Sequence, residues 1–150
     1  MTKPLVGTVL GEFQACLERA LTWRVDWTVG LDVPEYLDPE VARSMGHPDI
    51  PVPPGALVFF AFLPDQSWLE RAGIAYDRSL AVRRRLINHV PLHVGDVVTG
   101  RSVIGEVTEK RSGTARIVKT RIDTTYRLHG ELAAEEFVTY STRHVAKEVA

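Results

Sequence analysis

The sequence of 150 residues contains a single cysteine, Cys16, so no internal disulfide can form. Long apolar runs are absent too: the longest, from Ala56 to Leu63, is far too short to span a bilayer. Neither sign of charge dominates, since 18 basic residues stand against 19 acidic ones. The charge balance therefore favours neither a nucleic-acid partner nor a membrane surface. The first residues lack an apolar segment followed by a cleavage site, and we expect a cytoplasmic protein.

Repeats, low-complexity tracts and linkers rich in glycine or serine are also absent, so we expect one domain over residues 1–150. A domain of this length buries roughly 68–70% of the surface that its unfolded chain exposes. Such a domain forms a stable core without a disulfide or a structural metal ion.

The first half of the sequence predicts short helices joined by loops. Apolar residues recur at spacings of three and four in Gly11–Leu21, which predicts an amphipathic helix with Cys16 on its buried face. Gly30–Pro39 is expected to be a loop. Asp38 is expected to cap a short helix over Glu40–Ser44 that has proline at its first position.

Ala56–Leu63 is apolar on every side, and a helix of that kind must be buried all round. Valine and phenylalanine also favour strands. Pro54 suits a first helical turn, however, and Asp65–Arg71 continues with a helical pattern. We therefore predict one central buried helix. The aromatic residues expected in the core are Phe59, Phe60 and Phe62, and those expected in the core or at an interface are Trp23, Trp27 and Trp68.

From Leu80 onward apolar and polar residues alternate, as in strands with one buried face. The predicted strands are Leu80–Val90, Val97–Glu109, Thr114–Arg127 and Glu131–His144. Short turn sequences separate them, which predicts an antiparallel meander. Long antiparallel strands coil strongly, and a curved sheet packs most economically by wrapping around an all-apolar helix. The predicted fold class is α+β.

Three stretches of this sequence resemble those of a known family. They are Tyr36–Gly46 running into Ile50–Pro54, then Pro91–Gly100, and then Gly130–Glu136 with the strand after it. In this order and spacing they are similar to the MaoC-like hydratases and dehydratases, and most similar to the FAS1-like dehydratase branch. That branch includes the partner subunits of bacterial (3R)-hydroxyacyl-ACP dehydratases. The resemblance covers most of the chain from about Trp27 onward.

The resemblance implies the hot-dog fold, in which a curved antiparallel sheet wraps around a central helix. It implies hydration of an enoyl thioester or dehydration of an (R)-3-hydroxyacyl thioester, carried on CoA or on an acyl carrier protein, without a cofactor. In the family a backbone N–H at the N-terminus of the central helix binds the thioester oxygen. Pro54, Gly55 and Ala56 match that place. Proline has no N–H, so Gly55 or Ala56 must be the donor.

Active members of the family carry an Asp and a His in a loop with the pattern G-D-x-N-P-x-H. Aligned on Gly30 and Pro34, this sequence has Leu31 in place of the Asp and Tyr36 in place of the His. A slip of one residue would put Asp32 at the acidic position, so Asp32 and Tyr36 are the catalytic candidates. Leucine accepts no proton, and tyrosine, with an ordinary pKa of about 10, is a poor base at neutral pH. The resemblance therefore also implies a subunit that shapes the acyl channel while its partner supplies the catalysis.

Other functions remain open. Hot-dog thioesterases use a lone carboxylate, and Asp26, Asp32 or Glu35 could act in that way here. The chain could instead be a non-catalytic subunit that binds acyl thioesters. His47, two residues before Asp49, is a further candidate base, although a solvated loop histidine is the more common case.

The remaining histidines favour structural roles. His89 and His93 flank Pro91, which excludes helical spacing, and no cysteine or carboxylate cluster completes a metal site. His129 and His144 are expected to be exposed.

Other polar residues give expectations about turns, surface and assembly. Gly95 is expected to take a positive φ, and Asp96 to bond the backbone of its own turn. Side chains of Arg83–Arg85 alternate along a strand, so these cations are not expected to form one patch. A lone curved sheet leaves a long edge unpaired, so we expect an edge-to-edge dimer with a second copy or with a catalytic MaoC-like subunit.

Overall fold

The computed structural model describes residues 4–30, 32–59 and 67–145. The strands are β1 (Val9–Cys16), β2 (Ser79–Asn88), β3 (Val97–Ser112), β4 (Ala115–Leu128) and β5 (Glu131–Val145). The helical segments are α1 (Arg19–Val29), α2 (Pro34–Leu37), α3 (Pro39–Ser44), η1 (Ala56–Phe59), α4 (Ser67–Arg71) and η2 (Tyr76–Arg78). This combination confirms the α+β class.

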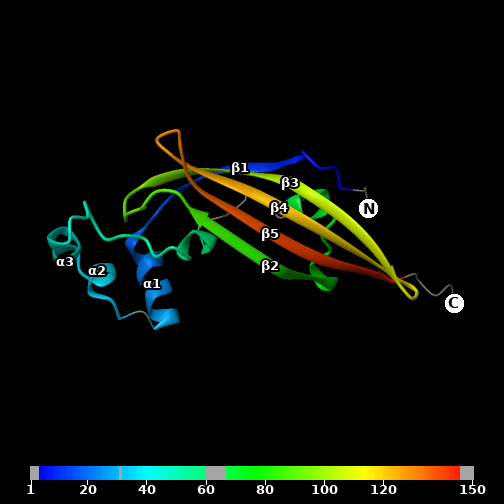
Figure 1. The fold of residues 1–150 in the computed structure, drawn as a ribbon, viewed down its shortest axis with the longest axis horizontal. Helices are drawn as coiled ribbons and strands as arrows, with labels where there is room; N and C mark the ends of the chain where they lie inside the picture. The colour runs from blue at the N-terminus through cyan, green and yellow to red at the C-terminus, as the bar shows by residue number, and fades with distance from the viewer. Residues whose placement is uncertain (1–3, 31, 60–66, 146–150) are drawn as a thin grey trace.

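The strands form one antiparallel sheet in the order β1-β3-β4-β5-β2. Figure 1 shows a long, curved sheet with α1, α2 and α3 gathered at one end. The four predicted strands are confirmed to within a few residues, and β3, β4 and β5 form a meander. The expectation that β2 pairs with β3 is wrong, because β2 pairs with β5 at the far edge. The connection from β2 to β3, residues 89–96, must therefore cross β5 and β4. It is long enough, since an extended residue covers about 3.3 Å and neighbouring strands are about 4.8 Å apart.

The predicted helix over Gly11–Leu21 is wrong. Residues Val9–Cys16 form strand β1 on the edge of β3, and the helix α1 starts only at Arg19. Cys16, predicted to be buried, is an exposed free thiol. Backbone pairing along β3 stabilises the extended conformation, and it outweighs the helical spacing of the apolar residues.

Only the start of the predicted central helix, residues 56–59, lies within the described residues. Ala56–Phe59 forms the 3-10 helix η1, with Ala56 and Leu57 buried. Phe59 is 47% exposed, so its assignment to the core is wrong. The predicted core residues Phe60 and Phe62 lie outside the described residues, as does most of the remainder of the predicted helix. The helical pattern predicted over Asp65–Arg71 is confirmed for α4.

The buried residues form two clusters along the inner face of the sheet. The larger includes Leu17, Val25, Val52, Leu57, Leu92 and Tyr126, and the smaller includes Leu10, Ile74, Ile104 and Ile122. The larger cluster packs α1 and η1 against the sheet. It includes Val52 and Leu92, so it also holds two of the family-like stretches in place.

Several surface expectations also change. Trp23 and Trp27 are 57% and 75% exposed, so they are not core residues, whereas Trp68 packs edge-on against Tyr140. His129 is exposed as predicted. His144 is partly buried, which lowers its pKa together with the charge of Arg116. No helix in the described part of the chain has the length and apolarity needed to cross a membrane.

Candidate functional site

The chain around α3 is shaped by its two caps. The Asp38 carboxylate accepts a hydrogen bond from the Glu40 N–H at 2.8 Å, which confirms the predicted N-cap. At the other end Gly46 has a φ of 93°, and the His47 N–H donates to the Ala42 carbonyl at 3.0 Å. These contacts end the helix and fix where His47 leaves it.

The residues after His47 pair with the turn that precedes β3. The Val52 N–H donates to the Leu92 carbonyl at 2.7 Å, and the Val94 N–H donates to the Ile50 carbonyl at 2.9 Å. Pro51 and His93 form the bridge between these two contacts. The pairing joins two of the family-like stretches.

The turn before β3 has the predicted geometry. Gly95 has a φ of 92°, and the Asp96 carboxylate accepts the His93 N–H at 2.8 Å. Both expectations for this turn are confirmed. Asp96 thereby fixes the backbone that carries the His93 ring.

A pocket of about 180 Å³ lies where these segments meet. It is lined by Glu35, Tyr36, His47, Pro51, Val52, Pro53, Pro54, Leu57, Asn88, Val90, Pro91 and Leu92. Two of the three family-like stretches contribute to it, and it combines apolar walls with a few polar groups. That composition is typical of a small-molecule site.

The structure brings together only some of the residues named from the sequence. Tyr36 and Pro54 line this pocket, whereas Asp32 is exposed and does not. Gly55 and Ala56 directly follow Pro54 but are not among the lining residues. Leu31 lies outside the described residues. The Ala56 N–H donates to the Pro53 carbonyl at 2.8 Å, so it is already engaged in a turn. Within the described residues the Gly55 N–H meets no acceptor, which leaves it as the free donor of the pair.

Of the three candidate carboxylates, Glu35 alone lines the pocket. Asp26 is 0% exposed, and within the described residues neither of its carboxylate oxygens has a hydrogen-bond partner. Burial raises the pKa of Asp26 above its ordinary value. Asp26 is therefore held in its neutral form more readily than a surface carboxyl.

The sequence did not indicate that two histidines meet at this pocket. His47 Nδ1 lies 3.2 Å from His93 Nε2, and their ring centroids are 5.4 Å apart. His89, considered beside His93 in the sequence, instead pairs with Glu135 at 2.8 Å. Among the described residues no group of three or more His, Cys, Asp or Glu side chains is arranged to hold a metal ion.

A further cluster of polar side chains, Tyr126, Glu136 and Arg84, lies on the inner face of the sheet. Glu136 is buried, accepts a hydrogen bond from the Tyr126 hydroxyl at 2.9 Å and lies 3.0 Å from Arg84 Nε. Burial raises the pKa of Tyr126 well above its ordinary value, and the Glu136 charge adds to the effect. Tyr126 therefore stays protonated and acts as a donor.

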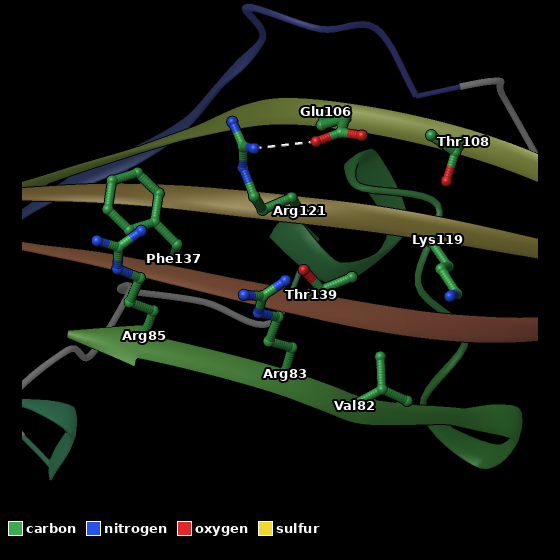
Figure 2. A pocket seen from close by; sticks show the side chains of 9 residues that line it. All are labelled: Val82, Arg83, Arg85, Glu106, Thr108, Lys119, Arg121, Phe137 and Thr139. Atoms are coloured by element: carbon green, nitrogen blue, oxygen red, sulfur yellow. Dashed lines mark hydrogen bonds and ion pairs between the residues drawn. The ribbon is translucent and has the colours of Figure 1, made fainter.

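The opposite face of the sheet carries a larger, open hollow of about 670 Å³. Figure 2 shows Arg85 on β2 beside Phe137 and Arg83 beside Thr139, with Arg121 on β4 paired with Glu106. The side chains of Arg83–Arg85 do alternate, because Arg84 turns to Glu136. Arg83 and Arg85 share this hollow with Lys119, but Arg84 lies on the other face, so the three arginines do not form one patch, as expected. Of the family-like stretches, the strand after Glu136 contributes to the hollow, through Phe137 and Thr139. The smaller pocket, where two of the three stretches meet, is the candidate site.

The fold defines the class of protein: a hot-dog domain, as in solved hydratases and dehydratases. The truncated HadBC (3R-hydroxyacyl-ACP dehydratase) complex of Mycobacterium tuberculosis matches with a TM-score of 0.75 at 22% identity, over 94% of this chain and 99% of that one. The ChsH1–ChsH2 complex of the same organism matches at 0.71 and 17% identity, over 92% and 89%. The (R)-hydratase of A. caviae involved in PHA biosynthesis matches at 0.70 and 17%, over 93% and 98%.

The family follows from the sequence. The model of the FAS1-like, dehydratase domain region matches residues 5–143, and the chain belongs to this family. The family resemblance found in the sequence is thereby confirmed. The chain matches no sequence among the curated proteins.

Proposed function

We propose that this chain binds acyl thioesters in the pocket of Tyr36 and Pro54 and acts in enoyl hydration or (R)-3-hydroxyacyl dehydration. The observation that carries the proposal is the convergence of two family-like stretches on one pocket in a chain of this family. In this assignment the free Gly55 N–H receives the thioester oxygen, because the Ala56 N–H is already bonded to Pro53. Such a donor stabilises the negative charge that develops on the oxygen during the reaction.

We infer from the alignment on Gly30 and Pro34 that the usual catalytic pair is replaced, and we propose that the chain works slowly alone and fully beside a hot-dog partner with an intact loop. Tyr36 stands where the family has its His, and Leu31 where it has its Asp. Loss of a positioned acid or base typically costs ~10²–10⁴-fold in rate. The named complexes among the structural neighbours, HadBC and ChsH1–ChsH2, support a paired assembly.

A crotonyl-CoA hydration assay tests the proposal, on the purified chain alone and after mixing with a MaoC-like subunit that has the Asp/His loop. We expect measurable binding and slow hydration alone. The triple variant Leu31→Asp, Val33→Asn, Tyr36→His should hydrate faster, while single changes do little because the two groups act as a unit. Absence of crotonyl-CoA binding, alone and with the partner, would contradict the assignment of the pocket.

Thioester hydrolysis is the second candidate, and the position of Glu35 in the pocket is the observation that favours it. Release of free CoA, read with a thiol reagent, separates hydrolysis from hydration. The assay needs the Cys16→Ser variant, because the Cys16 thiol is exposed and reacts with the same reagent. Hydrolysis that disappears in Glu35→Gln would favour the thioesterase.

A further inference from the structure

Three side chains form a line that ends in the pocket. Asp96 Oδ2 lies 3.9 Å from His93 Nδ1, and His93 Nε2 lies 3.2 Å from His47 Nδ1. His47 is the member that lines the pocket, while the His93 side chain is only 13% exposed. We call these three residues the histidine relay. Two backbone features fix it: the α3 cap holds His47, and the bridge to Pro51 holds His93.

Electrostatics selects one arrangement of protons in the relay. The Asp96 carboxylate attracts a proton on His93 Nδ1, since a carboxylate near an imidazole favours the N–H on the facing nitrogen. His93 Nε2 is then an acceptor and takes a hydrogen bond from His47 Nδ1. This leaves the lone pair of His47 on Nε2, a nitrogen that contacts no other polar group in the described part of the chain. A bare imidazole nitrogen is the common general base of enzymes near neutral pH.

We propose that His47 is the catalytic acid–base residue of this pocket, and that His93 and Asp96 are its positioning residues; the inference rests on the proposed function. In hydration, His47 Nε2 takes a proton from water as the water oxygen bonds the β-carbon of the enoyl thioester. The π electrons of the double bond move toward the thioester oxygen, which the Gly55 N–H receives. The imidazolium then returns its proton to the α-carbon, so atoms and charge balance. Dehydration is the reverse.

The other ionisable groups near His47 are few. Glu35 and Tyr36 line the same pocket, and Arg43 lies 3.5 Å from Asp49 in the loop just beyond His47. Of these, Glu35 is the one group that could replace His47 as a base. Glu35→Gln therefore accompanies the histidine variants in each experiment.

The first test is crotonyl-CoA kinetics of His47→Gln, with His89→Gln as the matched control. His89 is the other histidine with a close carboxylate partner, Glu135, and it does not line the pocket. We expect His47→Gln to lower kcat by about 10²-fold or more with little change in KM. His89→Gln should leave both unchanged.

The second test separates positioning from general damage to the fold. His93→Phe keeps a ring of similar size and removes both nitrogens, and it should lower kcat in the parent chain but have no effect in the His47→Gln background. Asp96→Asn keeps an oxygen for the His93 N–H and removes the charge. It should lower kcat in the parent chain and have little effect in the His47→Gln background, because Asp96 acts through His93 on His47.

The outcomes separate the two proposals. A chain that binds crotonyl-CoA and keeps its turnover in His47→Gln, or that binds it with no turnover at all, overturns the relay and leaves the binding assignment intact. Activity that survives His47→Gln but is lost in Glu35→Gln assigns the base to Glu35 and also overturns the relay. A chain that binds no acyl-CoA, alone and with the partner, contradicts the proposed function itself, and the relay falls with it.

Discussion

Two buried carboxyl groups, Asp26 and Glu136, differ in what surrounds them. Glu136 accepts the Tyr126 hydroxyl and lies beside Arg84, so hydrogen bonding and an opposite charge offset much of its desolvation. Asp26 is fully buried without a partner among the described residues. An unpartnered group of this kind is destabilising unless it is neutral or has a functional use. Among the described residues, Asp26 is the one side chain with two buried polar atoms that lack a hydrogen-bond partner.

Replacement of Asp26 should stabilise the protein at neutral pH. Folding raises the pKa of Asp26 above its ordinary value of 3.8. At pH values above 3.8 the carboxyl group therefore keeps its proton in the folded state and loses it in the unfolded state. The free energy of unfolding therefore falls as the pH rises above that value. Asp26→Asn should remove this dependence, and Asp26→Leu should raise the free energy of unfolding at pH 7 by about 1–3 kcal/mol. Urea unfolding from pH 3 to 8 measures both.

The control for this prediction is Asp32→Asn, because Asp32 is exposed. It should change the pH dependence little. If Asp26→Asn were less stable than the parent at neutral pH, the Asp26 carboxylate would be shown to make a favourable interaction in its charged form.

At the scale of single residues, the sequence predicted those parts of the site whose geometry is local. The Asp38 cap, the Gly95 turn and the bond from Asp96 depend on neighbours within a few positions. The contact between His47 and His93 joins residues 46 positions apart and depends on the bridge through Pro51. This contact depends on two non-repetitive segments pairing with each other. Sequence periodicity predicts helices and strands, but it does not predict a pairing of that kind.

At the scale of elements, the four long strands followed from period-two alternation, and β1 did not. Apolar residues of Gly11–Leu21 fit a helical spacing, but Phe13 packs over Gly100 on β3 and edge-on against Tyr126. This contact requires an extended segment beside β3. The sequence shows that Gly100 lies in a predicted strand, but a glycine in a strand does not identify the side chain that packs against it. The contact with Phe13 could therefore not be predicted.

The packing of Phe13 on Gly100 predicts a strong coupling between the two positions. A Cβ added at Gly100 would lie 2.0 Å from Phe13 Cζ, so Gly100→Ala forces the ring to move. We expect a loss of about 1–3 kcal/mol in the free energy of unfolding. In a Phe13→Leu background the same change should cost clearly less. A double-mutant cycle by urea unfolding measures the difference.

Gly55→Ala serves as the stability control, because an added Cβ there has no neighbour within 4 Å. It should alter the free energy of unfolding by no more than about 0.5 kcal/mol. An equal cost of Gly100→Ala in both backgrounds would show that Phe13 does not occupy this space in solution.

At the scale of the whole molecule, the curved sheet ends in two edges, β1 and β2. Along β2, Leu80 is 72% exposed and Val82 is 52% exposed. An edge strand with exposed apolar residues and unpaired backbone groups tends to pair with another chain or to aggregate. The exposed tryptophans of α1 are a further apolar surface that an isolated chain leaves in water.

We therefore predict that the chain pairs through β2 and is a homodimer when no other subunit is supplied. Light scattering at tens of micromolar should give twice the chain mass of 16.7 kDa. The double variant Leu80→Lys, Val82→Lys should shift the protein to monomer, because desolvating two added charges at a pairing edge is costly. Val9→Lys, on the opposite edge at a residue 42% exposed, is the matched control and should remain dimeric. A parent chain that is monomeric at this concentration contradicts the prediction, and dissociation by Val9→Lys alone would move the interface to β1.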